Sequence, residues 1–330
     1  MYTDMPQDRL WQHTSDAVEP PDFDEFWSRT LTQARRHDAA PQLERVAGRL
    51  TTVEVHDVTF PGFDGDPVRA WYRRPAGTDE PLPVVVQYVG YGGGRGHHLE
   101  NLLWASAGYA HLQMDTRGQG SGWSRGETAD PWGAGPQQRG VMTKGITDPE
   151  QYYYRRLFTD GVRAVDAARR LPGVDPARVA VVGGSQGGAT ALAVGGLVPD
   201  LAAVVAYVPF LCDIARAITI TDSYPFREVA DYLAIHREKV DLVLRTLGYI
   251  DGVAFARRAT APAYFSAALM DDIVPPSTVF AAHNAYAAPA QMQVWPFNGH
   301  EAGAVCDEEE AMAFLGGVLA GTGTPGSPTA

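Results

Sequence analysis

Short apolar runs alternate with amphipathic stretches over most of the chain, and this alternation predicts strands separated by helices. Most of the apolar runs show no regular polar position, so we expect the strands to be covered on both faces, as in a parallel sheet. The runs that we assign to strands are 84–89, 109–115, 179–182, 202–208, 262–270 and 292–295. The pattern predicts an α/β fold with a mostly parallel central sheet and helices on both faces.

The N-terminal part, residues 1–50, carries helical patterns and is predicted as a helical extension. The clearest pattern covers residues 22–35, where Phe23, Phe26 and Trp27 fall on one face of the helix. An apolar stripe of this kind normally faces a core. We therefore expect this helix to pack on the main domain.

Two interruptions break the alternation, and the first half also contains a hairpin pattern. Residues 51–74 hold two alternating runs on either side of P-G-F-D-G-D, which predicts an antiparallel hairpin. Residues 117–154 are rich in Gly, Pro and Trp and are predicted as a long ordered loop, and residues 160–171 are predicted as an amphipathic helix that Pro172 ends. Residues 210–258 are mostly helical, and an insertion there would lie at the carboxyl ends of the strands, where ligands bind. We interpret it as a lid; a helix pair for packing or oligomerisation is the alternative.

Residues 1–320 are predicted as one domain and 321–330 as a flexible tail.

Composition excludes several classes of partner. The 330 residues include 27 Lys and Arg against 39 Asp and Glu, a net charge of −12, and no basic stripe occurs. This balance argues against nucleic acid or an anionic membrane as a partner. No apolar run reaches transmembrane length, and the N-terminus lacks a signal-peptide core. The two cysteines, Cys212 and Cys306, form neither a disulfide framework nor a metal cluster and are expected as packing residues in a reducing cytoplasm.

Candidate chemistry begins where the strand at 179–182 runs into G-G-S-Q-G and an Ala-rich helical pattern follows. G-x-S-x-G between a strand and a helix is the nucleophile elbow of serine hydrolases. Its glycines permit a turn tight enough to hold Ser185 strained and exposed. The N–H of Gln186, at the start of the helix, is then placed to stabilise an oxyanion. The alternative is a small-residue turn that serves close packing alone.

A serine nucleophile needs a base and an acid, which follow it along the chain in α/β-hydrolases. His300 lies in the loop after the last predicted strand and is the candidate base. His283 falls within a helical pattern and is assigned to packing or surface. The acid is Asp271 or Asp272, at the end of the preceding strand, and the spacing does not choose between them.

A second oxyanion donor is expected from the glycine-rich loop 90–96, which follows an early strand. The N–H of Tyr91 is our candidate. The loop lacks the features of a phosphate cradle, because it has neither G-x-G-x-x-G with a following acidic residue nor G-K-[ST]. Tyr91, Trp123 and Pro225 are candidates for the walls that limit acyl size. No metal or cofactor is expected.

Three motifs together resemble those of the acetyl xylan esterase/cephalosporin C deacetylase family, which is carbohydrate esterase family 7 of the α/β-hydrolases. They are R-G-Q at 117–119, G-G-S-Q-G at 183–187 and His300-Glu301. R-G-Q is the discriminating element, because most hydrolases with an elbow lack it. The similarity runs from about residue 23 to residue 319. The segment 97–101, His283 and the Gly- and Ala-rich loop after Glu301 depart from the family pattern. The first and the last of these fall at or near the expected active site and leave substrate preference open.

The resemblance implies roles for individual residues. Ser185 would be the nucleophile, Asp271 the acid and His300 the base, with the backbone N–H groups of Tyr91 and Gln186 as the oxyanion hole. Arg117 and Gln119 would be structural, whereas the residues alone leave contact of Arg117 with substrate open.

The resemblance also implies a function: a cytoplasmic homo-hexamer that deacetylates xylo-oligosaccharides and small acetyl esters, including cephalosporin C, through an acetyl-enzyme. Its partner would be a small acetylated sugar or antibiotic. Two alternatives stay open at this point. They are another acyl hydrolase or peptidase of the same fold, and a non-catalytic binding protein.

Overall fold

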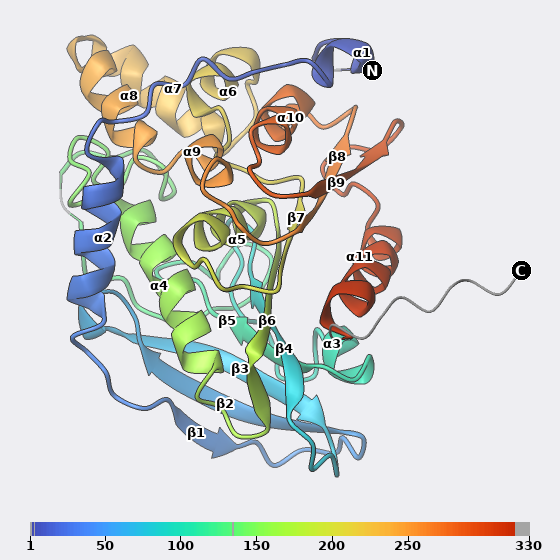
Figure 1. Cartoon of the computed structure of the whole chain (residues 1–330). Coiled ribbons are helices and arrows are strands. Elements are labelled where there is room, and N and C mark those ends of the chain that lie inside the picture. The colour runs from blue at the N-terminus through green and yellow to red at the C-terminus, as the bar shows by residue number, and fades with distance from the viewer. Residues whose placement is uncertain (1, 3, 134, 321–330) are drawn as a thin grey trace, which may run out of the picture.

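The computed structural model describes residues 2, 4–133 and 135–320 and is built around one nine-stranded sheet (Figure 1). The order across the sheet is β1-β2-β3-β5-β4-β6-β7-β8-β9. The strands are β1 (Gln42–Arg45), β2 (Val53–Pro61), β3 (Pro67–Pro75), β4 (Leu82–Tyr88), β5 (Ala110–Met114), β6 (Val174–Gly184), β7 (Ala203–Tyr207), β8 (Ala263–Ala268) and β9 (Ala290–Trp295). The predicted tail at 321–330 lies outside the described residues.

The sheet is parallel from β5 to β9 and antiparallel at its β1–β3 edge. The central strand β4 shows the reason for the continuous apolar runs, because Val84, Val85 and Val86 are all fully buried. Val86 pairs with Leu112 of β5 on one side and with Val181 of β6 on the other. The predicted mostly parallel sheet is confirmed.

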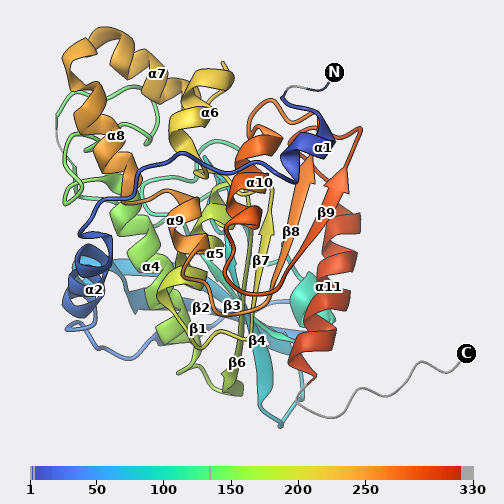
Figure 2. The ribbon, with the colours of Figure 1, turned by 45° about the horizontal axis from the view of Figure 1, so that its top comes forward.

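Helices cover both faces of the sheet, and α3 and α11 lie together on one of them (Figures 1 and 2). Most of the others pack on the opposite face or beyond the strand ends. The helices are α1 (Gln7–Leu10), α2 (Phe23–Ala34), α3 (Leu103–Ser106), α4 (Tyr153–Ala168), α5 (Gln186–Leu197), α6 (Ile214–Ile220), α7 (Phe226–Ile235), α8 (Val240–Gly248), α9 (Gly252–Ala256), α10 (Pro276–Asn284) and α11 (Val305–Leu319), with 3-10 turns η1 (Phe63–Gly65) and η2 (Arg237–Lys239). Among the described residues, no helix combines the length and apolarity needed to cross a membrane.

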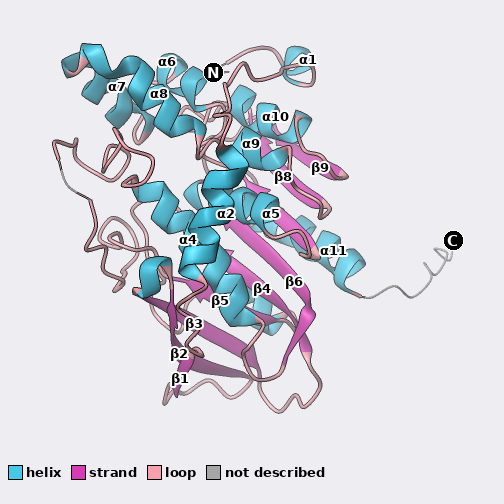
Figure 3. Ribbon diagram, turned by 60° about the vertical axis from the view of Figure 1, so that its left-hand side comes forward, coloured by secondary structure: helices cyan, strands magenta, loops and turns pink. Residues whose placement is uncertain are grey.

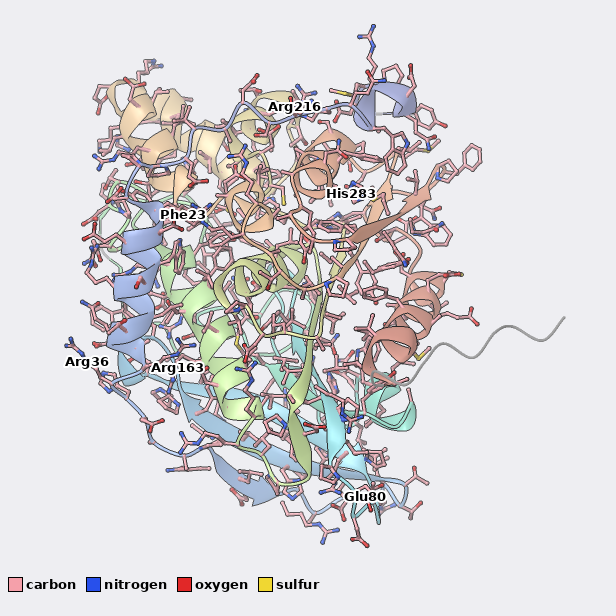
Figure 4. The ribbon with its side chains drawn as sticks, viewed as in Figure 1. Phe23, Arg36, Glu80, Arg163, Arg216 and His283 are labelled. Carbon is pink, nitrogen blue, oxygen red and sulfur yellow. The ribbon has the colours of Figure 1, made fainter. Side chains whose placement is uncertain are left out.

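The N-terminal segment lies against the C-terminal half of the chain. Phe23 of α2 packs edge-on against Phe255 of α9 with ring centroids 5.2 Å apart, near the start of the helix in Figure 4. Trp27 donates a hydrogen bond from Nε1 to the carbonyl of Tyr249 across 2.8 Å. Residues 1–50 are not helical throughout as predicted, because Gln42–Arg45 form the edge strand β1, which pairs with β2.

Helix α4 starts earlier than the sequence pattern suggested. The predicted helix began at residue 160, whereas α4 begins at Tyr153. Two adjacent arginines interrupt the apolar pattern in the sequence, although both side chains are buried and hydrogen-bonded to partners. Arg155 bonds Thr30, and Arg156 bonds Asp130 with Nε and Nη2 at 2.9 and 2.8 Å. The predicted long loop therefore ends at Tyr152, two residues before its assigned limit.

The segment predicted as an insertion consists of α6, α7, η2, α8 and α9. Helices α6, α7 and α8 gather at one end of the molecule (Figure 3). The chain start is fastened to this region, because Arg216 of α6 bonds Asp4 across 2.9 Å (Figure 4). Asp213, just before α6, accepts hydrogen bonds from Ser15 at 2.7 Å and contacts His13 at 3.2 Å.

Candidate active site

Ser185 occupies a strained turn between β6 and α5. Its backbone angles are φ 56° and ψ −119°, a region that residues other than glycine rarely adopt. The close approach of the strand and the helix needs flanking glycines: a Cβ at Gly183 would lie 2.2 Å from the carbonyl carbon of Gly187. A Cβ at Gly187 would lie 2.3 Å from the carbonyl oxygen of Tyr88. The sequence G-G-S-Q-G thus folds into the turn geometry of a nucleophile elbow.

His300 links Ser185 to a buried carboxylate. Its Nε2 lies 3.0 Å from Ser185 Oγ and its Nδ1 lies 2.8 Å from Asp271 Oδ2. This arrangement fits a neutral imidazole that donates from Nδ1 and accepts the serine hydroxyl proton at Nε2. His300 follows β9, and Asp271 follows β8, so both stand on loops at the same end of the sheet as Ser185.

The structure distinguishes the two candidate acids. The Asp271 side chain is fully buried, and its Oδ1 accepts the N–H groups of Ile273 and Val274, both at 2.9 Å. Asp272 faces the α6–α7 connection instead: its carbonyl accepts the hydroxyl of Thr221, and its Oδ2 lies 3.5 Å from Ser223 Oγ. Of the two, Asp271 is the carboxylate held against the imidazole.

The two proposed oxyanion donors lie on adjacent, cross-linked segments. Gln119 accepts the N–H of Gly92 at 2.6 Å and donates to Gln186 Oε1 at 2.9 Å. It therefore joins the glycine-rich loop to the residue that follows the nucleophile. Trp123 holds the same loop from outside, donating from Nε1 to the carbonyl of Tyr91 across 2.8 Å.

Arg117 is fully buried and is enclosed by carboxylates. It binds Asp160 through Nε at 2.5 Å and Nη2 at 2.8 Å, and its Nη1 lies 3.2 Å from both Asp66 and Asp130. Burial opposes the charge, but the neighbouring Asp160 carboxylate raises the pKa of Arg117. The residues alone left contact of Arg117 with substrate open, and in the structure its guanidinium nitrogens face carboxylates of the protein instead. The guanidinium fixes the long loop to α4.

A cavity of about 1130 Å³ opens at Ser185 and His300. All three residues predicted to limit acyl size border it. Trp123 is 67% exposed, whereas Pro225 is buried and precedes α7. Tyr91 borders it too, although its hydroxyl bonds the buried Glu228 of α7 at 2.6 Å.

Several residues around the cavity have roles that the sequence did not suggest. Segment 97–101, which departs from the family pattern, contributes His97, Glu100 and Asn101 to the lining. Glu228 resembles an ordinary surface charge in R-E-V-A-D, and no local signal marks it as buried.

The predicted packing roles are correct for one cysteine and wrong for the other. Cys212 is buried beside Phe210, but Cys306 is exposed, because it falls on the outer side of the first turn of α11. His283 packs in α10 with its ring 5.5 Å from that of Phe265, as expected for a packing residue (Figure 4). Within the part of the chain that the structure describes, no group of three or more His, Cys, Asp or Glu side chains could hold a metal ion.

A strained serine after a parallel strand, bonded to a histidine and an aspartate on later loops, defines the α/β-hydrolase class. The comparison with protein families then gives the particular family. The sequence model of the acetyl xylan esterase (AXE1) family matches residues 1–318, so the chain belongs to the acetyl xylan esterase family.

Solved structures of similar proteins cover nearly the whole chain. An acetyl xylan esterase from Paenibacillus sp. R4 is 37% identical with a TM-score of 0.91, over 96% of this chain and 100% of that one. Acetyl xylan esterase 1 from Thermoanaerobacterium sp. JW/SL YS485 is 32% identical with a TM-score of 0.88, over 94% and 98%.

A curated relative is longer than this chain. Acetyl esterase Axe7A of Xylanibacter ruminicola is 30% identical over 287 residues, or 85% of this chain. The match spans 63% of the length of that relative.

Proposed function

We propose that the protein is a serine esterase that removes acetyl groups from acetylated xylo-oligosaccharides and related small acetyl esters, cephalosporin C among them. The observation that carries the proposal is the continuous chain Asp271–His300–Ser185, at 2.8 and 3.0 Å, beside an open cavity. The substrate class is supported by the names of the similar proteins, two acetyl xylan esterases and an acetyl esterase.

The proposed reaction passes through an acetyl-enzyme. His300 takes the hydroxyl proton of Ser185 as Oγ attacks the acetyl carbonyl carbon, giving a tetrahedral oxyanion. The C–O bond to the alcohol then breaks, and His300 returns the proton to the departing alkoxide. Water attacks the acetyl-enzyme by the same steps and releases acetate. Asp271 keeps the imidazole in the required tautomer and stabilises the imidazolium.

The oxyanion would lie between the N–H groups of Tyr91 and Gln186. Neither N–H donates a hydrogen bond to another described residue, so both are available. Gln186 opens α5, where the helix dipole also favours negative charge. Removing one such donor costs about 3–4 kcal/mol in other enzymes.

Acyl size is proposed to be limited by Tyr91, Trp123 and Pro225. Trp123 is exposed, and its ring packs so closely on Gly93 that a Cβ at Gly93 would lie 2.3 Å from it. Removal of the Trp123 side chain would therefore widen the cavity. Wild type should hydrolyse p-nitrophenyl acetate faster than the butyrate, and Trp123→Ala should narrow that difference. Equal rates for both esters in the wild type would mean that these walls do not limit acyl size.

The deciding experiment measures acetate release from acetylated xylo-oligosaccharides, cephalosporin C and p-nitrophenyl acetate by wild type and Ser185→Ala. Release from the sugars, lost by several orders of magnitude in the variant with its fold intact, supports the proposal. Cleavage of peptide amides in preference to acetyl esters would instead identify a peptidase. Near-normal turnover by Ser185→Ala would exclude Ser185 as the nucleophile. The homo-hexamer and the cytoplasmic location stay predictions.

A further inference from the structure

The lining of the cavity extends beyond Ser185 to side chains on the face of the sheet that α3 and α11 cover. Figure 2 shows these two helices beside the strands. Side chains from β4, β5, the end of β7, the loop before α3 and the first turn of α11 border this part of the cavity. We call it the polar arm, and its lining includes Gln87, His97, Asn101, Gln113, Tyr207 and Glu308. On the other side of Ser185, Tyr224, Pro225 and Ile273 come from the insertion and from the loop after β8.

Two groups in the polar arm have unused hydrogen-bonding capacity. The Tyr207 hydroxyl is buried without a partner among the described residues. The carboxylate of Glu308 is half-buried, and among the same residues it accepts no hydrogen bond. A polar group shielded from water is normally paired, so the Tyr207 hydroxyl is suited to a polar ligand that enters the arm, and the carboxylate of Glu308 can accept a hydrogen bond from the same ligand.

The neighbouring Asp307 shows that this lack of partners is specific to Glu308. Asp307 Oδ1 accepts from Tyr264 Oη at 2.9 Å and from Trp295 Nε1 at 3.0 Å, and its Oδ2 accepts the N–H of Gly303 at 2.9 Å. Asp307 therefore holds α11 against β8 and β9. Glu308 has no comparable part in the fold, and its side chain borders the cavity instead.

The remaining charges of the arm decide which ligands it favours. Glu100, Asp307 and Glu308 border the cavity here, whereas Arg125 is an exposed positive group on its border. An anionic ligand would meet these carboxylates, so the arm disfavours it. Carboxylates, amides and a phenol together accept and donate hydrogen bonds, which matches the hydroxyls of a neutral sugar.

We propose that the polar arm binds the leaving-group sugar of the ester, with Glu308 accepting a hydrogen bond from a sugar hydroxyl and Tyr207 making a second polar contact. The inference rests on the proposed esterase function and deepens it. In this arrangement the acetyl group lies on the side of Ser185 where Pro225 borders the cavity, and the alcohol lies in the polar arm beneath α11. The protein then prefers acetyl esters of neutral sugars over esters whose leaving group carries a carboxylate, as that of cephalosporin C does.

The test compares Glu308→Ala and Glu308→Gln with Glu309→Ala, a control on the next residue, which is exposed and does not border the cavity. Loss of a hydrogen bond to a charged group should raise KM for acetylated xylo-oligosaccharides about 10-fold in Glu308→Ala. The change for p-nitrophenyl acetate should be several-fold smaller, because its leaving group has no hydroxyl to reach Glu308. Glu308→Gln keeps a carbonyl acceptor, so it should retain most sugar affinity while its kcat/KM for cephalosporin C rises.

Binding without turnover gives an independent readout. Calorimetry would measure the affinity of unacetylated xylo-oligosaccharide for Ser185→Ala and for Ser185→Ala/Glu308→Ala. Weaker binding by the double variant supports the polar arm as the sugar site. Equal affinities, or an unchanged KM in Glu308→Ala while wild type deacetylates the sugar, would overturn the inference and leave the esterase function standing. If wild type cleaves only p-nitrophenyl acetate and binds no sugar, the proposed sugar function itself fails.

Discussion

The phenol of Tyr91 donates a hydrogen bond to Glu228 Oε1 across 2.6 Å, which joins the glycine-rich loop to helix α7. The same hydroxyl accepts the N–H of Val141 at 2.7 Å, and Glu228 Oε2 accepts the N–H of Met142 at 3.0 Å. Glu228 is 2% exposed. One buried carboxylate thus connects three segments that surround the cavity. We infer that Glu228 is a positioning residue for the Tyr91 backbone, whose N–H is a proposed oxyanion donor.

Removing this carboxylate should slow turnover without removing the donor. Loss of a whole oxyanion donor costs about 10²–10³-fold in kcat, so a less firmly held donor in Glu228→Ala should cost about 10-fold. Tyr91→Phe removes the same hydrogen bond from the other side. Because both variants break one contact, the double variant should be little slower than either single one. Additive losses in kcat for p-nitrophenyl acetate would show that the two residues act separately.

The titration of Glu228 should appear in the pH dependence of stability. Burial raises the pKa of Glu228 to about 7, although the hydrogen bonds from Tyr91 and Met142 favour its carboxylate. For a group whose pKa is higher in the folded state, its contribution to stability is complete below the unfolded pKa and is lost as pH rises through the folded one. The free energy of unfolding of wild type, relative to that of Glu228→Gln, should therefore fall between about pH 4.5 and pH 7. A difference that stays constant over this range in urea unfolding would contradict the shift.

Much of the fold and of the candidate site could be predicted from local sequence patterns. Strand order along the chain, the turn at Ser185 and the loop position of His300 depend on residues close together in sequence, and the structure brings Ser185 and His300 within hydrogen-bonding distance. The choice between Asp271 and Asp272 depended on which one faces the imidazole. That is set by the course of the loop after β8, which the residues alone do not reveal.

Long-range pairing was the part that sequence patterns missed. Buried Arg156, Arg117 and Glu228 carry charges that look exposed in sequence, and each is satisfied by a residue far away in the chain. Without these partners in view, α4 was assigned too late a start. The insertion supplies both Pro225 to the cavity and Glu228 to the interior, whereas its movement as a lid stays a prediction.

Breaking the buried ion pair of Arg117 should destabilise the protein strongly. Arg117→Ala leaves Asp160 buried without its counter-charge, and the loss of one partner of such a pair typically costs about 3–5 kcal/mol. Arg227→Ala is the control, since its pair with Asp231 lies at the surface, where solvent screens the charges and the pair contributes little to stability. Urea unfolding measures both. Similar small losses for the two variants would show that the Arg117 cluster contributes little to stability.

The two adjacent aspartates offer the sharpest test of the proposed acid. Asp271→Asn preserves shape but lets the amide donate to His300 Nδ1, which favours the wrong tautomer, and the equivalent change in a serine protease lowers kcat about 10⁴-fold. Asp272→Asn changes a carboxylate that faces Ser223 instead, so its kcat for p-nitrophenyl acetate should stay close to that of wild type. The two variants have the same change in charge at consecutive positions, so a general electrostatic effect would slow both alike. Only a direct contact with the imidazole predicts a loss confined to Asp271→Asn, and a comparable loss in Asp272→Asn would exclude that explanation.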